Sequence, residues 1–194
     1  LAAVAAIFHT VNHATFKASL FMAVGVIDHE TGTRDMRKLS GLRRSMPVTA
    51  ALAIVAAAAM AGVPLLNGFL SKEMFLAEAI AHTGGRHLNL ALPVLATVAS
   101  LLSVLYSVRF IHQTFFGPPP VDLPKTPHEP PRWMRFPIEV LVGLCILVGV
   151  LPAITIGPVL AVAVRSVLGP DVPYYSLAVW HGFNLPLVMS AIAL

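Results

Sequence analysis

Long apolar segments separated by short charged ones dominate this chain. Three stretches contain no Asp, Glu, Lys or Arg: 47–71, 88–108 and 140–164. A helix needs about 20 apolar residues to cross the hydrocarbon of a bilayer. The pattern therefore predicts an all-α fold, a polytopic transmembrane helix bundle. Its expected spans lie near 1–27, 47–81, 88–115 and 138–156, and a further span starts within 177–194.

The second expected span is too long and too interrupted to be one regular helix. Four residues that disfavour a continuous helix cluster in its middle: Gly62, Pro64, Asn67 and Gly68. A proline removes a backbone donor and clashes with the carbonyl group four residues earlier. Such breaks survive in membranes only where protein or water satisfies the freed backbone groups. We expect one discontinuous helix over about 47–81, with half-helices 47–63 and 68–81.

The remaining segments are short or irregular. The segment 117–137 has seven prolines between Pro118 and Pro131, which favours an extended linker along the membrane surface. Residues 159–168 are expected to form a short amphipathic helix with Arg165 on its polar side. Because the chain begins with Leu and both ends lie in apolar runs, we expect it to be an internal fragment of a longer protein.

The charges are few and unevenly placed. Only 11% of residues are charged, against about 25% in a soluble domain. The segments 28–46 and 117–137 carry eight Lys and Arg between them, and the turn 83–87 carries one, Arg86. Basic loops stay on the cytoplasmic side, so we expect the first two segments to be cytoplasmic and the turn external. The basic residues therefore indicate membrane topology, with the lipid bilayer as a partner and no nucleic acid.

A polar stripe is the clearest candidate for function. His9, His13 and Lys17 are the ionisable residues of the first span, at spacing i, i+4, i+8. Each step rotates only ~40° and rises ~6 Å, so the three groups share one face over ~12 Å. Ionisable groups in hydrocarbon usually face a bundle interior and mark an ion path. Histidine suits proton relay because its usual pKa is near neutrality.

Two other interpretations of the stripe remain. Lys17 could extend to the headgroups while the histidines make hydrogen bonds between helices. His9 and His13 also have the i, i+4 spacing of a zinc-binding helix. However, Thr10 stands where the metalloprotease motif needs Glu, and no third ligand is evident. We therefore expect no metal site.

Lys72 and Glu73 follow the expected helix break directly. They could form a local ion pair that offsets the cost of burial. Adjacent residues on a helix point ~100° apart, however, so they do not face each other well. Lys72 is therefore the stronger candidate for a proton-carrying site, and Glu73 is a possible one. Glu139 is expected in the first turn of the fourth span, where a carboxylate favours the helix N-terminus.

Long motifs in this chain resemble a known family. The runs FHTVNHATFKASLFMAVGVIDHETGTRDMRKLSGL (8–42) and MAGVPLLNGFLSKEMF (60–75) resemble the antiporter-like subunits shared by respiratory complex I and Mrp-type cation/proton antiporters. Within that group, HETGTRD (29–35), GFLSKEMF (68–75) and WHGFNLPL (180–187) resemble the large, A-type subunit of the Mrp Na⁺/H⁺ antiporter.

The resemblance implies a fold and a set of roles. It implies a chain of protonatable side chains along the membrane midplane, to which His9, His13, Lys17 and Lys72 would contribute. Residues 1–156 would be the end of the antiporter-like channel module, with four transmembrane helices. Residues 157–194 would hold the amphipathic segment, a loop and the start of a further transmembrane helix. The first repeat of the module would lie outside this chain.

The resemblance also implies partners and a location. The chain would be a secondary transporter subunit, not an enzyme, in a hetero-oligomeric antiporter complex of the bacterial inner membrane. It would exchange Na⁺ for H⁺ and use no cofactor. One alternative is the corresponding proton-pumping subunit of NADH-quinone oxidoreductase, complex I. A second is a membrane scaffold subunit that does not transport, although a scaffold would not need buried lysines.

Overall fold

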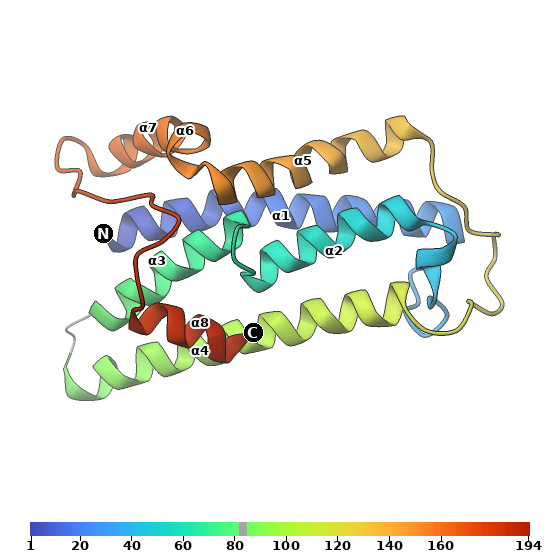
Figure 1. Cartoon of the computed structure of the whole chain (residues 1–194), viewed down its shortest axis with the longest axis horizontal. Helices are drawn as coiled ribbons and strands as arrows, with labels where there is room; N and C mark the ends of the chain where they lie inside the picture. Colours follow the sequence, from blue (N-terminus) through green and yellow to red (C-terminus); the bar gives the residue numbers. More distant parts are fainter. Residues whose placement is uncertain (82–84) are drawn as a thin grey trace.

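Helices account for nearly all regular structure in the part of the chain that the computed structural model describes, residues 1–81 and 85–194, and these residues contain no β-strand (Figure 1). The expected all-α fold is therefore confirmed. The turn expected at 83–87 falls partly outside the described residues. The helices in chain order are α1 (Ala2–Thr31), the 3₁₀ turn η1 (Leu42–Arg44), α2 (Pro47–Ala61), α3 (Asn67–Ala81), α4 (Arg86–Phe115), α5 (Arg132–Val150), α6 (Pro152–Thr155), α7 (Gly157–Leu168) and α8 (Leu185–Ala193).

Helix α1 lies at the centre of the bundle. It packs against α5, α3, α2 and α7, and Figure 1 shows it between α5 and the pair α2–α3. Its 30 residues extend over about 45 Å, enough to cross a bilayer. It continues four residues beyond the expected end at 27. Gly32 then closes it in the left-handed conformation and donates its N–H to the carbonyl oxygen of Asp28.

The discontinuous helix consists of α2 and α3. Gly62 adopts φ of 85° and donates its N–H to the carbonyl oxygens of Ala58 and Ala59, which ends α2 two residues earlier than expected. Helix α3 begins at Asn67, one residue earlier than expected. Each half has 15 residues, or about 22 Å, so only the two together match the thickness of a bilayer.

Two helices in the described residues are long and apolar enough to span a membrane by themselves: Leu88–Phe115 of α4 and Arg132–Val150, which is α5. Most of the apolar side chains of α4 face outward. Leu90, Leu95 and Leu102 are each more than half exposed. Such a surface would be costly in water and suits contact with lipid or with another membrane segment.

The proline-rich segment joins the ends of several helices. Lys125 donates its backbone N–H to Thr31 at the end of α1, and its ammonium donates to the carbonyl oxygen of His29 at 2.9 Å. Glu129 accepts hydrogen bonds from the backbone N–H groups of Val48 and Thr49 at the start of α2, where no side chain of α2 itself provides a cap. The segment therefore supplies the missing partners of two helix ends.

Helix α5 begins at Arg132, earlier than the expected 138, and contains Pro137. The position expected for Glu139 was therefore wrong. Glu139 lies in the third turn rather than the first, too far from the N-terminus to interact with it. Its carboxylate instead faces Arg135 one turn earlier, at 3.9 Å.

Ion pairs organise the basic loop between α1 and η1. A side-chain hydrogen bond from Arg37 is the main cause that lowers the pKa of the Asp35 carboxyl to about 2. Arg34 forms a second ion pair, with Asp28 at 2.8 Å. The segment 28–46 is net positive because it contains five basic residues and three acidic ones.

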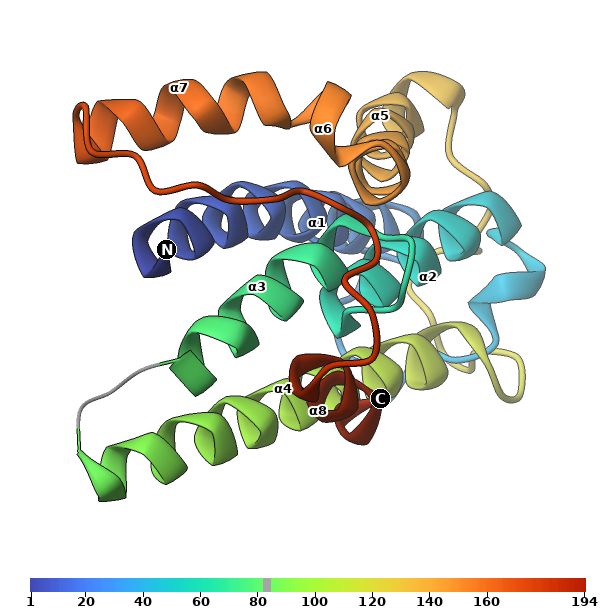
Figure 2. The same cartoon turned by 60° about the vertical axis from the view of Figure 1, so that its left-hand side comes forward.

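The end of the chain returns across the bundle. After α7, on which Arg165 is exposed as expected, residues 170–184 form no helix and run past α1 and α3 to α8 (Figure 2). Helix α8 begins at Leu185, eight residues later than 177, because Asn184 caps it by accepting the N–H of Leu187 at 2.9 Å. Helix α8 packs against α3 and α4.

Candidate functional site

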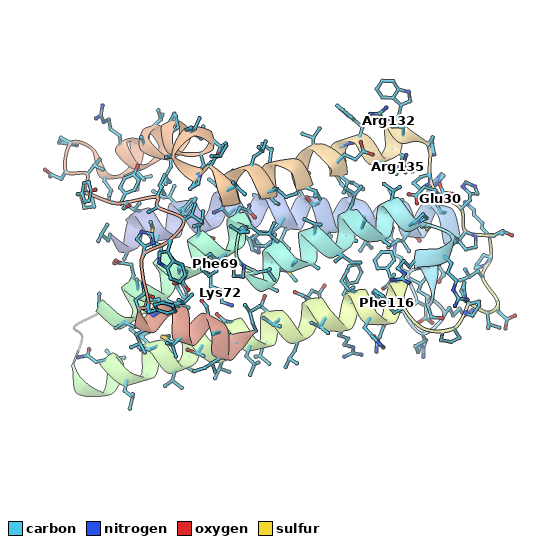
Figure 3. The ribbon with its side chains drawn as sticks, in the orientation of Figure 1. Glu30, Phe69, Lys72, Phe116, Arg132 and Arg135 are labelled. Carbon is cyan, nitrogen blue, oxygen red and sulfur yellow. The ribbon has the colours of Figure 1, made fainter. Side chains whose placement is uncertain are left out.

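Lys72 lies in the first turns of α3, close to the break in the discontinuous helix. Its side chain is buried, with 8% of its surface exposed. Its Nζ donates a hydrogen bond to the carbonyl oxygen of Ala61 at 3.1 Å, and Figure 3 shows it between α3 and α4. Gly62 makes room for this side chain, since a Cβ there would lie 2.7 Å from Cδ of Lys72.

The first histidine of the stripe reaches the same place. His9 and Lys72 both line a cavity of about 240 Å³ between α1, α3 and α4, together with Phe16, Met60, Gly68, Phe75, Ala96, Ala99, Ser100 and Ser103. Ser103 donates to the carbonyl oxygen of Met60, near the end of α2. The cavity has room for several water molecules, and its polar groups supply the partners that such waters require.

Other members of the stripe lie farther from this cavity. His13 is exposed on α1, and its ring centroid lies 5.9 Å from that of His9. Lys17 lies beside a separate cavity of about 40 Å³, where its Nζ sits 5.4 Å from the ring centre of Tyr106 on α4. The structure thus brings His9 and Lys72 together, while Lys17 faces a different part of α4. A continuous chain through all four residues stays a prediction.

Two buried asparagines, Asn12 and Asn67, hold the break against α1, and the sequence pattern predicted a role only for Asn67. Asn12 donates to the backbone carbonyl of Asn67 at 3.2 Å, and the amide of Asn67 donates to the side-chain oxygen of Asn12 at 3.2 Å. Both residues are almost fully buried. A buried amide costs free energy unless it finds a partner, so Asn12 on an apolar face was a signal that another polar group packs there.

Ser71 is a second site residue that the sequence pattern did not predict. Its Oγ lies 3.2 Å from Nδ1 of His9, within hydrogen-bonding distance. Ser71 precedes Lys72 on α3, so it connects the stripe on α1 directly to the helix that carries the buried lysine. A lone serine in an apolar segment gives no such signal in the sequence.

Glycines allow close packing on both sides of the break. A Cβ on Gly68 would collide with the carbonyl oxygen of Ala59 in α2. On the other side, a Cβ on Gly149 of α5 would collide with the carbonyl oxygen of Leu65. Leu65 itself adopts φ of 67°, a left-handed conformation that is strained for a leucine. Pro64, between the two halves, is exposed.

Glu73 has a partner of its own, different from that of Lys72. The hydroxyl of Ser190 on α8 donates a hydrogen bond to Oε1 of Glu73. Lys72 binds Ala61 instead, so the two neighbouring side chains take different partners. In the described part of the chain, no three His, Cys, Asp or Glu side chains converge as metal ligands would.

The fold and this site define a class: a membrane helix bundle in which a buried lysine lies at a broken helix and shares a cavity with a histidine. A family model described as "NADH:quinone oxidoreductase/Mrp antiporter, TM" matches residues 1–106. The chain belongs to this family of membrane proteins. The resemblance predicted from the sequence is thereby confirmed.

Individual relatives agree with this assignment. The chain is 65% identical to the probable K⁺/H⁺ antiporter A/B subunit of Rhizobium meliloti over its whole length, which is 19% of that relative. It is 41% identical to the Na⁺/H⁺ antiporter A-type subunit of Bacillus subtilis, over 98% of this chain and 25% of the relative. The chain thus spans a quarter or less of the length of these two relatives.

Solved structures give the same fold. The Mrp complex from Dietzia sp. DQ12-45-1b contains a chain that is 39% identical, with a TM-score of 0.82, over 98% of this chain and 20% of that one. An archaeal membrane-bound sulfane sulfur reductase is similar at 23% identity with a TM-score of 0.69, over 90% of this chain and 34% of that one, and this likeness concerns the fold alone.

Proposed function

We propose that this chain is part of the large, A-type subunit of an Mrp-type antiporter, a multisubunit complex that exchanges protons for a monovalent cation across a bacterial cell membrane. The names of the relatives and the family support a transporter subunit rather than an enzyme. The other subunits of the complex would be its partners, together with the bilayer, the cation and H⁺.

The observation that carries the proposal is the shared cavity of His9 and Lys72 at the helix break. Lysine can hold a proton as an ammonium and release it to an acceptor in reach. Water in the cavity would connect Lys72 to His9. The imidazole of His9 is within hydrogen-bonding distance of Ser71, with Nδ1 and Oγ 3.2 Å apart. From His9 the proton would pass to His13 and then toward Lys17.

The ends of the half-helices suit this role. The last carbonyl groups of α2 lack partners within the helix and form the negative end of its dipole. The ammonium of Lys72 donates a hydrogen bond to one of these groups, the carbonyl oxygen of Ala61, and is stabilised there. When Lys72 releases its proton, this charge interaction is lost. The geometry of the break therefore depends on the protonation of Lys72, and cation movement elsewhere in the complex could be coupled to it.

The relatives differ in the cation that their names state, K⁺ in one and Na⁺ in the other. The test uses the full-length complex in everted vesicles from a host without antiporters of its own. A respiratory pH gradient is formed, and NaCl, KCl or choline chloride is added while dequenching of a pH-sensitive dye is recorded. We expect dequenching with NaCl or KCl and none with choline chloride. No dequenching with either salt in an assembled complex would contradict the proposal.

The same preparation separates the two alternatives. A complex I subunit would generate the proton gradient from NADH oxidation by quinone, whereas an antiporter dissipates a gradient when the cation is added. A scaffold subunit predicts that exchange survives replacement of Lys72, provided that the complex assembles.

A further inference from the structure

A second cavity, of about 290 Å³, lies at the end of the bundle opposite the basic loops. Its walls are α3, the beginning of α1 and the irregular segment that leads into α8 (Figure 2). Its titratable side chains include Glu73 and Glu78 of α3 and His181 of the irregular segment. Tyr174, Tyr175 and Trp180 also line it. The cavity is thus a mainly aromatic and apolar space with a few ionisable groups.

Helix α3 separates this cavity from the one at the break. Lys72 lines the 240 Å³ cavity and Glu73 lines the 290 Å³ cavity. The two residues are consecutive, so their side chains leave the helix ~100° apart, and each lines a different cavity. Glu73 is therefore the ionisable group nearest in sequence to Lys72 that opens onto the second cavity.

The carboxylate of Glu73 is held in a fixed position. Ser190 is buried, with 1% of its surface exposed, and its hydroxyl donates to Oε1 of Glu73. This hydrogen bond connects α3 to α8, a helix that lies outside the matched family region of residues 1–106. A carboxylate has a second oxygen that can accept a proton.

We propose that Glu73 is the proton acceptor and donor through which Lys72 exchanges protons with the 290 Å³ cavity, and that Ser190 positions its carboxylate. This inference rests on the antiport function proposed above. In one direction the ammonium of Lys72 gives a proton to water, which passes a proton to the carboxylate of Glu73; a neutral amine and a carboxylic acid remain. The acid then releases the proton to water in the cavity, and the carboxylate is restored. In the other direction the same steps run in reverse.

The experiment compares Glu73→Gln, Ser190→Ala and Ser190→Thr in the full-length complex, reconstituted in vesicles. Cation-driven proton exchange is measured while pH is varied only on the side of the 290 Å³ cavity. Glutamine keeps the size of the side chain but cannot carry a proton. We expect Glu73→Gln to slow exchange by at least about tenfold. The remaining exchange should lose most of its dependence on pH at this side.

Ser190→Ala tests the positioning role without removing the carboxylate. It should slow exchange by about fivefold and displace the pH profile, since one hydrogen bond to a charged group is lost. Ser190→Thr keeps the hydroxyl and should restore both the rate and the profile. Ser166→Ala on α7, whose exposed hydroxyl bonds to its own helix, is the matched control and should behave as wild type.

The outcomes distinguish this inference from the proposed function. If Lys72→Ala abolishes exchange while Glu73→Gln and Ser190→Ala keep the wild-type rate and pH profile, the route through Glu73 is wrong and the function stands. If Glu73→Gln fails to assemble, the pH dependence of the exchange rate in the two Ser190 variants decides. A pH profile that Ser190→Ala displaces and Ser190→Thr restores supports the route. A wild-type pH profile in both variants overturns it.

Discussion

The ammonium of Lys72 lies 3.1 Å from the carbonyl oxygen of Ala61 and so connects the two halves of the discontinuous helix. Ala61 is the last residue of α2, and its carbonyl group has no partner further along the helix. A positive charge at this end is stabilised by the helix dipole. The hydrogen bond therefore relates the protonation of Lys72 to the geometry of the break.

The polar stripe on α1 should be required for rapid exchange. His13→Ala and Lys17→Ala should each lower the exchange rate strongly, because each removes a group that can hold a proton. Lys17→Arg should fail as well, since arginine stays protonated and cannot release its proton. Exchange is measured by dye dequenching in everted vesicles. Full activity of Lys17→Arg would show that the position needs a fixed charge rather than proton exchange.

The close approach of the two half-helices should make Gly68→Ala harmful. The added methyl group would collide with the carbonyl oxygen of Ala59, and such overpacking costs about 1–3 kcal/mol. Gly143→Ala in α5 is the matched control, because a Cβ there meets no atom within 4 Å. We expect the Tm of the purified complex to fall for Gly68→Ala only. An equal Tm for both variants would mean that α2 and α3 can move apart at the break without loss of stability.

The cap that Glu129 provides at α2 should stabilise the protein. Its carboxylate accepts hydrogen bonds from the backbone of Val48 and Thr49 and from the hydroxyl of Thr49 at 2.6 Å. Glu129→Ala should destabilise the fold by about 1–2 kcal/mol, as the loss of a helix cap does. Thermal unfolding in detergent measures this, with Asp171→Ala, an exposed carboxylate in the segment after α7, as the control. A Tm unchanged from wild type would exclude a capping role.

The distribution of basic residues predicts the orientation of the bundle. Single cysteines at Lys38 and Thr126 should be cytoplasmic, and a cysteine at Asp171, at the other end of the bundle, should be external. All three positions are exposed, and the buried Cys145 is first replaced by serine. An impermeant thiol reagent added to intact cells should label only the cysteine at position 171. Labelling of positions 38 and 126 instead would mean that the orientation is the reverse of the predicted one. The 290 Å³ cavity would then lie on the cytoplasmic side.

Much of the fold was predictable because hydrophobic length and helix breakers are local properties. The apolar runs indicated the helices, and Pro64 with its neighbouring glycines indicated the break near 62–68. Boundaries were harder, because an apolar run does not determine the residue at which a helix begins or is capped. Helix α5 begins six residues early, at Arg132, and α8 begins late because Asn184 caps it.

The candidate site was predictable only in part. Ionisable residues in apolar segments are conspicuous, so His9 and Lys72 could be singled out from the sequence. Their common cavity depends on how α1 and α3 cross, which no local pattern determines. The same applies to Ser71, which contacts His9, and to Ser190, which bonds to Glu73, because a serine in an apolar helix can also bond to its own backbone.

The most direct test of the central claim is the exchange rate of Lys72→Ala in the full-length assembled complex. Assembly is first verified by size-exclusion chromatography. Cation-driven dequenching is then recorded in everted vesicles against wild type and against Lys38→Ala, an exposed lysine of the basic loop. We predict that Lys72→Ala abolishes exchange while Lys38→Ala retains it. Wild-type exchange by an assembled Lys72→Ala complex would contradict the claim that Lys72 carries the proton.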